Sequence, residues 1–235
     1  MFNASNKKFM ASNTEKQITL KFSTLPRATK KALDFLSKQA WMEKTKWYLA
    51  GGTALAIQVG NRKSVDLDFF TQQKDFDTNN FLTYFLKNKN WKTTIQKEGT
   101  IYGELFGAKI SFIAYPFFIP KQEMISYGYV KILRTLDVAV MKIIAISQRG
   151  KKRDFFDLYW CAKNVESLKN LIKKLKVQYP SVAHDYHHII KSLVFFEDAE
   201  NDPDPEIYFK SSWKKVKKFF IQEAPTIATK LFDLE

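Results

Sequence analysis

A chain of 235 residues with 45% hydrophobic side chains can form one large core or two small ones, and it is too apolar to be disordered throughout. Its formal net charge of +14 favours polyanionic partners such as nucleic acid or nucleotides. The single cysteine, Cys161, excludes an intramolecular disulfide framework, and no stretch has the apolar length of a signal-peptide core or a membrane span. We therefore expect a soluble protein of the cytoplasm with no membrane partner.

The first third of the chain predicts an N-terminal arm followed by alternating helices and strands. Residues 1–23 are polar and rich in lysine, so we expect a loose arm with a short strand at 17–22. Apolar residues at helical spacing predict an amphipathic helix over 26–41. The segments that follow are predicted as a strand at 46–50, a helix at 53–59, a loop at 60–64, a strand at 65–70, and a helix capped by Asp77 or Thr78 that ends at Lys87.

The pattern changes near residue 133. Short β-branched and aromatic segments separated by Gly or Pro predict strands at 92–99, 100–106, 108–115 and 127–133. Beyond them the apolar spacing predicts helices at 136–148, 154–163, 166–178, 184–196 and 205–221, and an acidic loop at 196–206. This change predicts an α/β (α+β) fold with two domains, a mixed-sheet domain at 24–133 and an α-helical domain at 134–235.

Two aspartates alternate along the predicted strand at 65–70. The strand period of two places Asp66 and Asp68 on one face. It places Val65, Leu67 and Phe69 on the other. Two carboxylates this close repel each other unless a cation lies between them, and Mg²⁺ prefers carboxylate and phosphate oxygens. An Asp-x-Asp pair alone also occurs on exposed edge strands, so it predicts a metal site only together with other features.

The second feature is the turn Gly51-Gly52-Thr53 between a predicted strand and a predicted helix. Backbone N–H groups at such a turn can bind phosphates, and glycine lets the backbone approach the ligand closely. An ordinary turn with Thr53 as helix cap would have the same composition. A phosphate-binding turn followed by a metal-binding carboxylate pair is the combination that phosphoryl or nucleotidyl transfer requires, so we predict that chemistry with Mg²⁺.

A third group of polar residues lies in the predicted helices after residue 136. Lys142 and Arg149 are two helical turns apart and project from the same side. Asp154 and Asp157 share a helix face, and Arg153 can pair with Asp157 at i,i+4. We expect the three cations to neutralise a triphosphate, and Asp154 or Asp157 to orient a base or a cation. A salt-bridged surface is the alternative for this segment.

The segment "GGTALAIQVGNRKSVDLDFF" resembles the signature of the polymerase-β-like nucleotidyltransferase superfamily. Within it the chain is most similar to the AbiEii/AbiGii-type toxin family, whose "R-x-S-x-D-L-D-F" segment corresponds to Arg62–Phe69, with Ser64, Asp66 and Asp68 at its polar positions. A later lysine and an "R-G-x-x-R-D-x-x-D-L" element match Lys142 and the segment 149–158 in the same order. The resemblance covers about 47–160. It implies that Arg62 and Ser64 contact the triphosphate.

One departure from the superfamily concerns a third carboxylate, which many members carry on a strand after the Asp-x-Asp pair. The corresponding strand here, at 108–115, has Lys109 and Ser111 on one face and no acid. Either two aspartates suffice, or Glu104 or an acid of the later motif replaces the third carboxylate, or activity is degraded.

The resemblance also implies a function. It implies transfer of a nucleoside monophosphate from an NTP to the 3′ end of a tRNA, by the toxin of a toxin–antitoxin pair with a cognate antitoxin. Basic clusters at 149–153 and 214–218 agree with an RNA acceptor. Two alternatives remain: transfer to a hydroxyl of a protein or a small molecule, and an inactive nucleotidyltransferase fold that only binds RNA or nucleotides.

Overall fold

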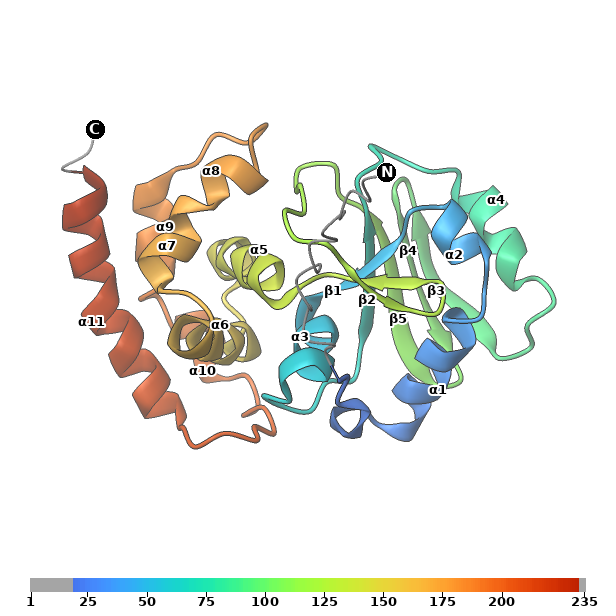
Figure 1. Ribbon diagram of the computed structural model, residues 1–235, viewed down its shortest axis with the longest axis horizontal. Coiled ribbons are helices and arrows are strands. Elements are labelled where there is room, and N and C mark those ends of the chain that lie inside the picture. Colours follow the sequence, from blue (N-terminus) through green and yellow to red (C-terminus); the bar gives the residue numbers. More distant parts are fainter. Residues whose placement is uncertain (1–18, 233–235) are drawn as a thin grey trace, which may run out of the picture.

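A seven-stranded mixed sheet forms one half of the molecule and a group of helices forms the other (Figure 1). The computed structural model describes residues 19–232. The strands are β1 (Tyr48–Ala50), β2 (Leu67–Thr71), β3 (Trp91–Lys97), β4 (Thr100–Leu105), β5 (Ala108–Ala114), β6 (Ile125–Tyr127) and β7 (Val130–Ile132). Their order is β3-β4-β5-β2-β1-β7-β6, with the pairs β2/β5 and β1/β7 parallel and the others antiparallel. The predicted α/β class with a mixed sheet is confirmed.

The sheet is covered by helices on both faces. The α-helices before residue 133 are α1 (Arg27–Leu36), α2 (Trp41–Lys44), α3 (Gly51–Val59) and α4 (Thr78–Leu82), and the 3-10 helices are η1 (Phe22–Thr24) and η2 (Thr83–Phe85). Helices α1, α2 and α4 lie on one side of the sheet and α3 on the other (Figure 1). Aromatic rings fill the core under α2 and α4, where Phe112 stacks on Phe69 at a centroid distance of 5.2 Å.

The chain after residue 133 is helical, as predicted. It contains α5 (Thr135–Arg149), α6 (Lys152–Asn164), α7 (Leu168–Lys173), α8 (Leu175–Gln178), α9 (Tyr186–Ser192), α10 (Glu197–Glu200) and α11 (Trp213–Phe232). Helix α5 lies between the sheet half and the other helices, and α11 forms the outer end of the molecule (Figure 1). The boundary predicted near residue 133 falls between β7 and α5, and the division into two domains stays a prediction.

Several predicted helices are shorter than expected or begin elsewhere. The helix predicted over 26–41 ends at Leu36, because the Ser37 hydroxyl donates to the carbonyl of Asp34 and the next turn tightens to i→i−3 bonds. Asp77 caps α4 as predicted, but the α-helix ends at Leu82 and the chain continues as η2. The segment predicted over 166–178 divides into α7 and α8, and that over 184–196 is limited to α9.

Two further predictions fail near the chain ends. The strand predicted at 17–22 lies partly outside the described residues, and its described part leads into the 3-10 helix η1. The helix predicted over 205–221 begins only at Trp213, because two prolines keep the preceding chain extended and Ile207 forms a β-bridge with Arg62. The predicted acidic loop at 196–206 contains the short helix α10.

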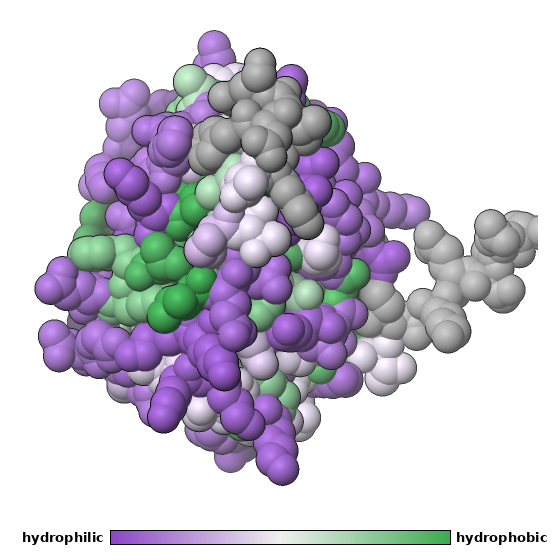
Figure 2. All heavy atoms as spheres, turned by 90° about the vertical axis from the view of Figure 1, so that its left-hand side faces the viewer, coloured by the Kyte–Doolittle hydropathy of each residue, from purple (hydrophilic) through white to green (hydrophobic). Residues whose placement is uncertain are grey.

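Figure 2 views the molecule from the side of α11. The surface is mostly hydrophilic and is interrupted by a hydrophobic patch. No helix among residues 19–232 is long and apolar enough to cross a lipid bilayer.

Candidate active site

A cavity of about 570 Å³ lies between the sheet and α5. Its walls come from β2 to β5, the N-terminus of α3, the loop after α3, and α5 with the start of α6. The predicted site residues that line it are Gly51, Gly52, Arg62, Ser64, Asp66, Asp68, Lys142, Arg149 and Arg153. Thr53, Asp154 and Asp157 lie behind this surface and are buried. The fold therefore brings all three groups of predicted polar residues together.

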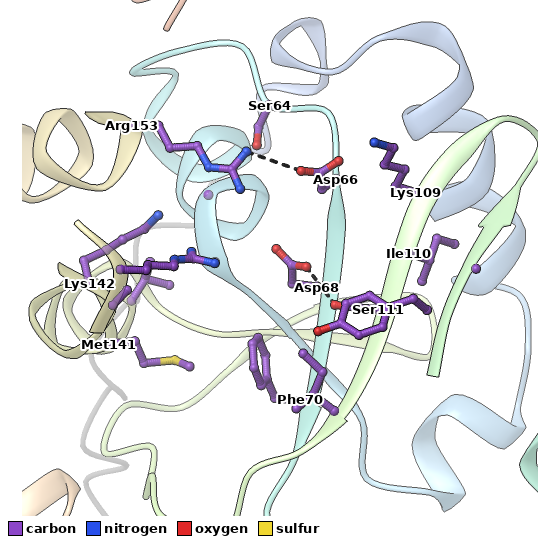
Figure 3. Close-up of a pocket in the computed structure, with 18 of the residues that line it drawn as sticks. Ser64, Asp66, Asp68, Phe70, Lys109, Ile110, Ser111, Met141, Lys142 and Arg153 are labelled. Atoms are coloured by element: carbon purple, nitrogen blue, oxygen red, sulfur yellow. Dashed lines mark hydrogen bonds and ion pairs between the residues drawn. The ribbon is translucent and has the colours of Figure 1, made fainter. Parts of the chain in front are cut away.

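Asp68 on β2 and Asp66, the residue just before β2, both line the cavity. Both are half-buried, and Phe70 continues the same face into the cavity wall (Figure 3). Leu67 and Phe69 are fully buried on the opposite face, as predicted. Val65 does not join them, because the strand begins only at Leu67, and its side chain is 47% exposed.

The Gly51-Gly52 turn forms the first turn of α3 and meets the aspartates at close range. Gly51 has a left-handed φ of +65°, and a Cβ built on it would lie 3.1 Å from Oδ2 of Asp68. A Cβ on Gly52 would lie 2.1 Å from Nη2 of Arg62, which leaves no room for any side chain. The N-cap residue of this helix is Ala50, whose side chain offers no capping hydrogen bond. The N–H groups of the helix N-terminus therefore remain available to an anion in the cavity.

Thr53 fastens the loop that carries Asp66 to the start of α3. Its hydroxyl donates to the backbone carbonyl of Asp66 and lies 2.9 Å from Oγ of Ser64. The side chain is buried, so only its backbone N–H could contact a phosphate in this structure. Ser64 lines the cavity beside it.

Behind the cavity, two arginines and a lysine neutralise two buried aspartates. Arg62 pairs with Asp157 through two bonds, Nε to Oδ1 and Nη2 to Oδ2, each 2.8 Å long. The ammonium of Lys142 lies 2.5 Å from Oδ1 of Asp154 and 2.8 Å from Oδ2 of Asp157. Arg149 reaches the other oxygen of Asp154 at 3.2 Å. Lys142 and Arg149 thus share one side of α5, as predicted, and converge on Asp154.

The predicted pairing of Arg153 with Asp157 is wrong. The ion-pair partner of Arg153 is Asp66, whose Oδ2 lies 3.5 Å from Nη1 of Arg153 (Figure 3). The carboxylate of Asp157 instead forms ion pairs with Arg62 and Lys142. It also accepts a hydrogen bond at Oδ1 from the side-chain amide of Asn61, at 2.8 Å. Asn61 was absent from the predicted set. Its position beside Arg62 in the loop after α3 is the only sequence signal for it.

These contacts shift the pKa values of Asp154, Asp157 and Asp68. Burial alone would raise the pKa of Asp157, but the adjacent Arg62 and Lys142 outweigh it and hold the pKa well below its ordinary value. Lys142 and Arg149 likewise keep the pKa of Asp154 low against the effect of burial. The pKa of Asp68 is raised, because burial and the charge of Asp66 outweigh the hydrogen bond from Ser111.

Comparison with known proteins assigns this arrangement to a family. The profile of the family described as "Nucleotidyl transferase AbiEii toxin, Type IV TA system" matches residues 35–100 and 122–233. The chain belongs to the AbiEii nucleotidyltransferase toxin family. An uncharacterised protein of Aquifex aeolicus is 38% identical over 177 residues, which cover 74% of this chain and 84% of that protein.

Two solved structures share the fold of this AbiEii-family nucleotidyltransferase. A putative nucleotidyltransferase from H. pylori has a TM-score of 0.50 and 19% identity, covering 89% of this chain and 98% of its own. The nucleotidyltransferase toxin MenT4 from Mycobacterium tuberculosis has a TM-score of 0.50 and 13% identity, covering 83% of this chain and 84% of its own. At these identities the likeness concerns the nucleotidyltransferase fold.

Ser111 faces Asp68 from β5, the strand on which the resemblance predicted a third carboxylate. It pairs in register with Asp68, and its hydroxyl donates to Oδ1 of Asp68 at 2.7 Å. Glu104 lines the same cavity from β4, but within residues 19–232 no three acidic, His or Cys side chains are grouped closely enough to hold a metal. The acidic side chains of the later motif, Asp154 and Asp157, already form ion pairs with arginine and lysine.

Asp66 and Asp68 nevertheless fit a divalent cation. Both carboxylates come from one face of one strand and border the cavity, and the raised pKa of Asp68 reflects in part the repulsion that a cation would relieve. Two carboxylate ligands suit Mg²⁺, which usually completes its coordination with water and substrate phosphates.

Most basic side chains of the cluster at 149–153 pair with acidic residues of the same chain. Lys152 is buried, and its ammonium contacts the carbonyl of Asp202 at 2.6 Å and the carboxylate of Asp204 at 3.1 Å. Lys151 pairs with Asp202 at 3.2 Å. The side chain of Lys152 is thus enclosed by the segment 200–204, and contact of the cluster with RNA stays a prediction.

Proposed function

We propose that this nucleotidyltransferase transfers a nucleoside monophosphate from an NTP to the 3′-terminal hydroxyl of a tRNA and releases pyrophosphate. The observation that supports it is one cavity that combines an uncapped helix N-terminus, two adjacent carboxylates and an arginine-rich wall. Phosphoryl-transfer enzymes need these elements to position a triphosphate and stabilise its charge. As a toxin of this family, the protein would be neutralised by a cognate antitoxin.

The residues divide into a phosphate-binding set and a metal-binding set. The N–H groups of Gly51 and Gly52 would bind phosphate oxygens, and Ser64 and the exposed guanidinium of Arg149 would add hydrogen bonds from the side. Asp66 and Asp68 would hold Mg²⁺, which supplies charge neutralisation on the phosphates when bound. Because the residue of β5 that faces Asp68 is Ser111 and not an acid, we propose that two aspartates suffice.

Lys142 and Arg62 would act on the nucleotide from the edge of the cavity. Both line it, yet each is held by the buried aspartates, so their positive charge is fixed in place before the substrate arrives. Such fixed charge costs little reorganisation when charge develops on the phosphates. Asp157 and Asp154 would thus position these cations and would not contact the substrate.

The test is incubation of the protein with each labelled NTP, Mg²⁺ and total tRNA. Transfer of label to the tRNA 3′ end supports the proposal, and its absence with tRNA whose terminal ribose was first oxidised by periodate would locate the acceptor at the terminal 2′,3′-diol. Label found on a protein or on a small molecule would identify the acceptor as a hydroxyl of that kind of molecule. Saturable NTP binding without pyrophosphate release would contradict catalysis and favour a binding module.

A further inference from the structure

The floor of the cavity continues beyond the aspartates as one row of side chains on four neighbouring strands. Asp68 on β2 pairs in register with Ser111 on β5, Ser111 with Tyr102 on β4, and Tyr102 with Ile95 on β3. Residues directly opposite one another point to the same face of a sheet, and neighbouring strands are about 4.8 Å apart. Tyr102 therefore lies roughly 10 Å from Asp68 along the cavity floor.

A β-bulge enlarges the far end of this floor. The register of β3 against β4 shifts between Thr93 and Ile95, which leaves Thr94 as an additional residue. Thr94 and Ile95 both line the cavity, so the bulge lies at its wall. Bulges are common beside active sites, where they can turn a side chain towards a ligand.

The ring of Tyr102 is exposed in the cavity without an aromatic or hydrogen-bonding partner among residues 19–232. Tyr102 is 37% exposed. Ile95, 51% exposed, lies beside it at the sheet edge. Lys109 lines the same part of the cavity and has no ion-pair partner within that range.

The two sides of the aspartates differ in chemistry. Figure 3 shows Arg153 and Lys142 on one side of Asp66 and Asp68, and Ser111 and Lys109 on the other. The arginine-rich side suits a triphosphate, whereas an aromatic ring with an apolar neighbour suits a nucleobase. Because Tyr102 is exposed on β4, the strand next to the edge strand β3, its ring is accessible to a single strand that enters from solvent.

We propose that Tyr102, with Ile95 and Thr94, binds the terminal nucleobase of a single-stranded RNA acceptor by stacking, and that Lys109 contacts its backbone phosphate. Unpaired RNA ends are commonly recognised by stacking on aromatic side chains. This inference rests on the proposed function, since it places the acceptor of that reaction on the side of Asp68 opposite the triphosphate.

The experiment uses a short single-stranded RNA whose 3′-terminal base is 2-aminopurine, a fluorescent base that is quenched on stacking. The full chain is compared with Tyr102→Ala, with Tyr102→Phe, which keeps the ring, and with Tyr129→Ala. Tyr129 is a matched control, because it is 42% exposed and lies on the turn between β6 and β7, at the other edge of the sheet.

Wild type, Tyr102→Phe and Tyr129→Ala should quench the probe equally. Tyr102→Ala should lose the quenching and bind the RNA about tenfold more weakly, in line with the effect of removing one stacked aromatic side chain. In the transfer reaction the KM for RNA should rise by a similar factor in Tyr102→Ala, while the KM for NTP stays unchanged.

Two results would overturn the inference: a raised KM for NTP alone, which would put the incoming base on Tyr102, or RNA binding that is insensitive to Tyr102→Ala. The proposed function can fail separately. If quenching depends on Tyr102 but the protein transfers nothing to RNA, only the proposed reaction is refuted. If transfer to RNA is unchanged in Tyr102→Ala, only this binding site is refuted.

Discussion

Arg62 and Asp157 form a buried two-bonded ion pair between residues that are 95 positions apart in the chain. The pair ties the loop that leads to Asp66 and Asp68 to helix α6. It stands directly behind Gly52, whose missing side chain provides the space for the guanidinium. The geometry of the catalytic loop therefore depends on a contact with the helical half of the chain.

Replacing Asp157 should destabilise the protein strongly. Asp157→Ala leaves Arg62 without its partner and Lys142 with only one, and removing one member of a buried ion pair costs roughly 3–5 kcal/mol. Chemical unfolding measures this loss. Glu206→Gln, which breaks the exposed pair with Lys63, is the control and should leave the melting temperature unchanged. Equal stability of Asp157→Ala and wild type would show that the buried pair contributes nothing.

Acid should weaken the fold through Asp154 and Asp157. Both have a pKa in the folded protein below the ordinary value of 3.8, so the unfolded chain takes up protons first as the pH falls. The contribution of the two aspartates to stability is complete above the ordinary pKa. It is lost as the pH falls towards their lower pKa in the folded protein. Urea unfolding at about pH 5 and about pH 3 gives the free energy of unfolding at each pH. Between these two pH values it should fall less for Asp154→Asn than for wild type. An equal loss would exclude Asp154 as a source of the acid dependence.

Gly51 and Gly107 offer a matched pair of substitutions to alanine. Both have a left-handed φ, +65° and +83°, so both changes cost about 1–2 kcal/mol in backbone conformation. Only at Gly51 does the new methyl group meet the catalytic site, 3.1 Å from Oδ2 of Asp68, whereas at Gly107 nothing lies within 4 Å. Transfer should fall at least about tenfold in Gly51→Ala beyond the loss in Gly107→Ala. Similar rates for the two variants would count against a close approach of Gly51 to the reacting groups.

Asp68→Asn should abolish transfer while preserving the fold. The raised pKa of Asp68 reflects burial and repulsion by Asp66, and an asparagine oxygen can still accept the hydrogen bond from Ser111. Thermal unfolding should therefore show no loss of stability. Binding of Mn²⁺ in place of Mg²⁺, followed by electron paramagnetic resonance, should be lost with the activity. A variant that turns over at the wild-type rate would remove Asp68 from the metal site.

Salt dependence should identify an RNA-binding surface on α11. Lys214, Lys215 and Lys218 are exposed on this helix, and none of them forms an ion pair within residues 19–232. If they contact phosphates, log affinity for tRNA falls linearly with log salt, by about 0.7–0.9 per contact. Changing all three to glutamine should reduce the slope by roughly 2. A flat profile for wild type would contradict an RNA acceptor, and an unchanged slope in the variant would place the contacts elsewhere.

The sequence by itself determined the features that depend on near neighbours. The shared face of Asp66 and Asp68 follows from the period of a strand, and the shared side of Lys142 and Arg149 follows from the period of a helix. The Gly51-Gly52 turn was likewise visible between a strand and a helix, and together these motifs indicated the family.

Tertiary structure alone decided which charges meet. Arg153 pairs with Asp66 and not with Asp157, Lys152 is enclosed by the segment 200–204, and Ser111 faces Asp68. Each of these partners comes from a distant part of the chain. Helix and strand periods fix only the direction in which a side chain leaves its own element, and the partner it meets depends on how the sheet, α5 and α6 pack together.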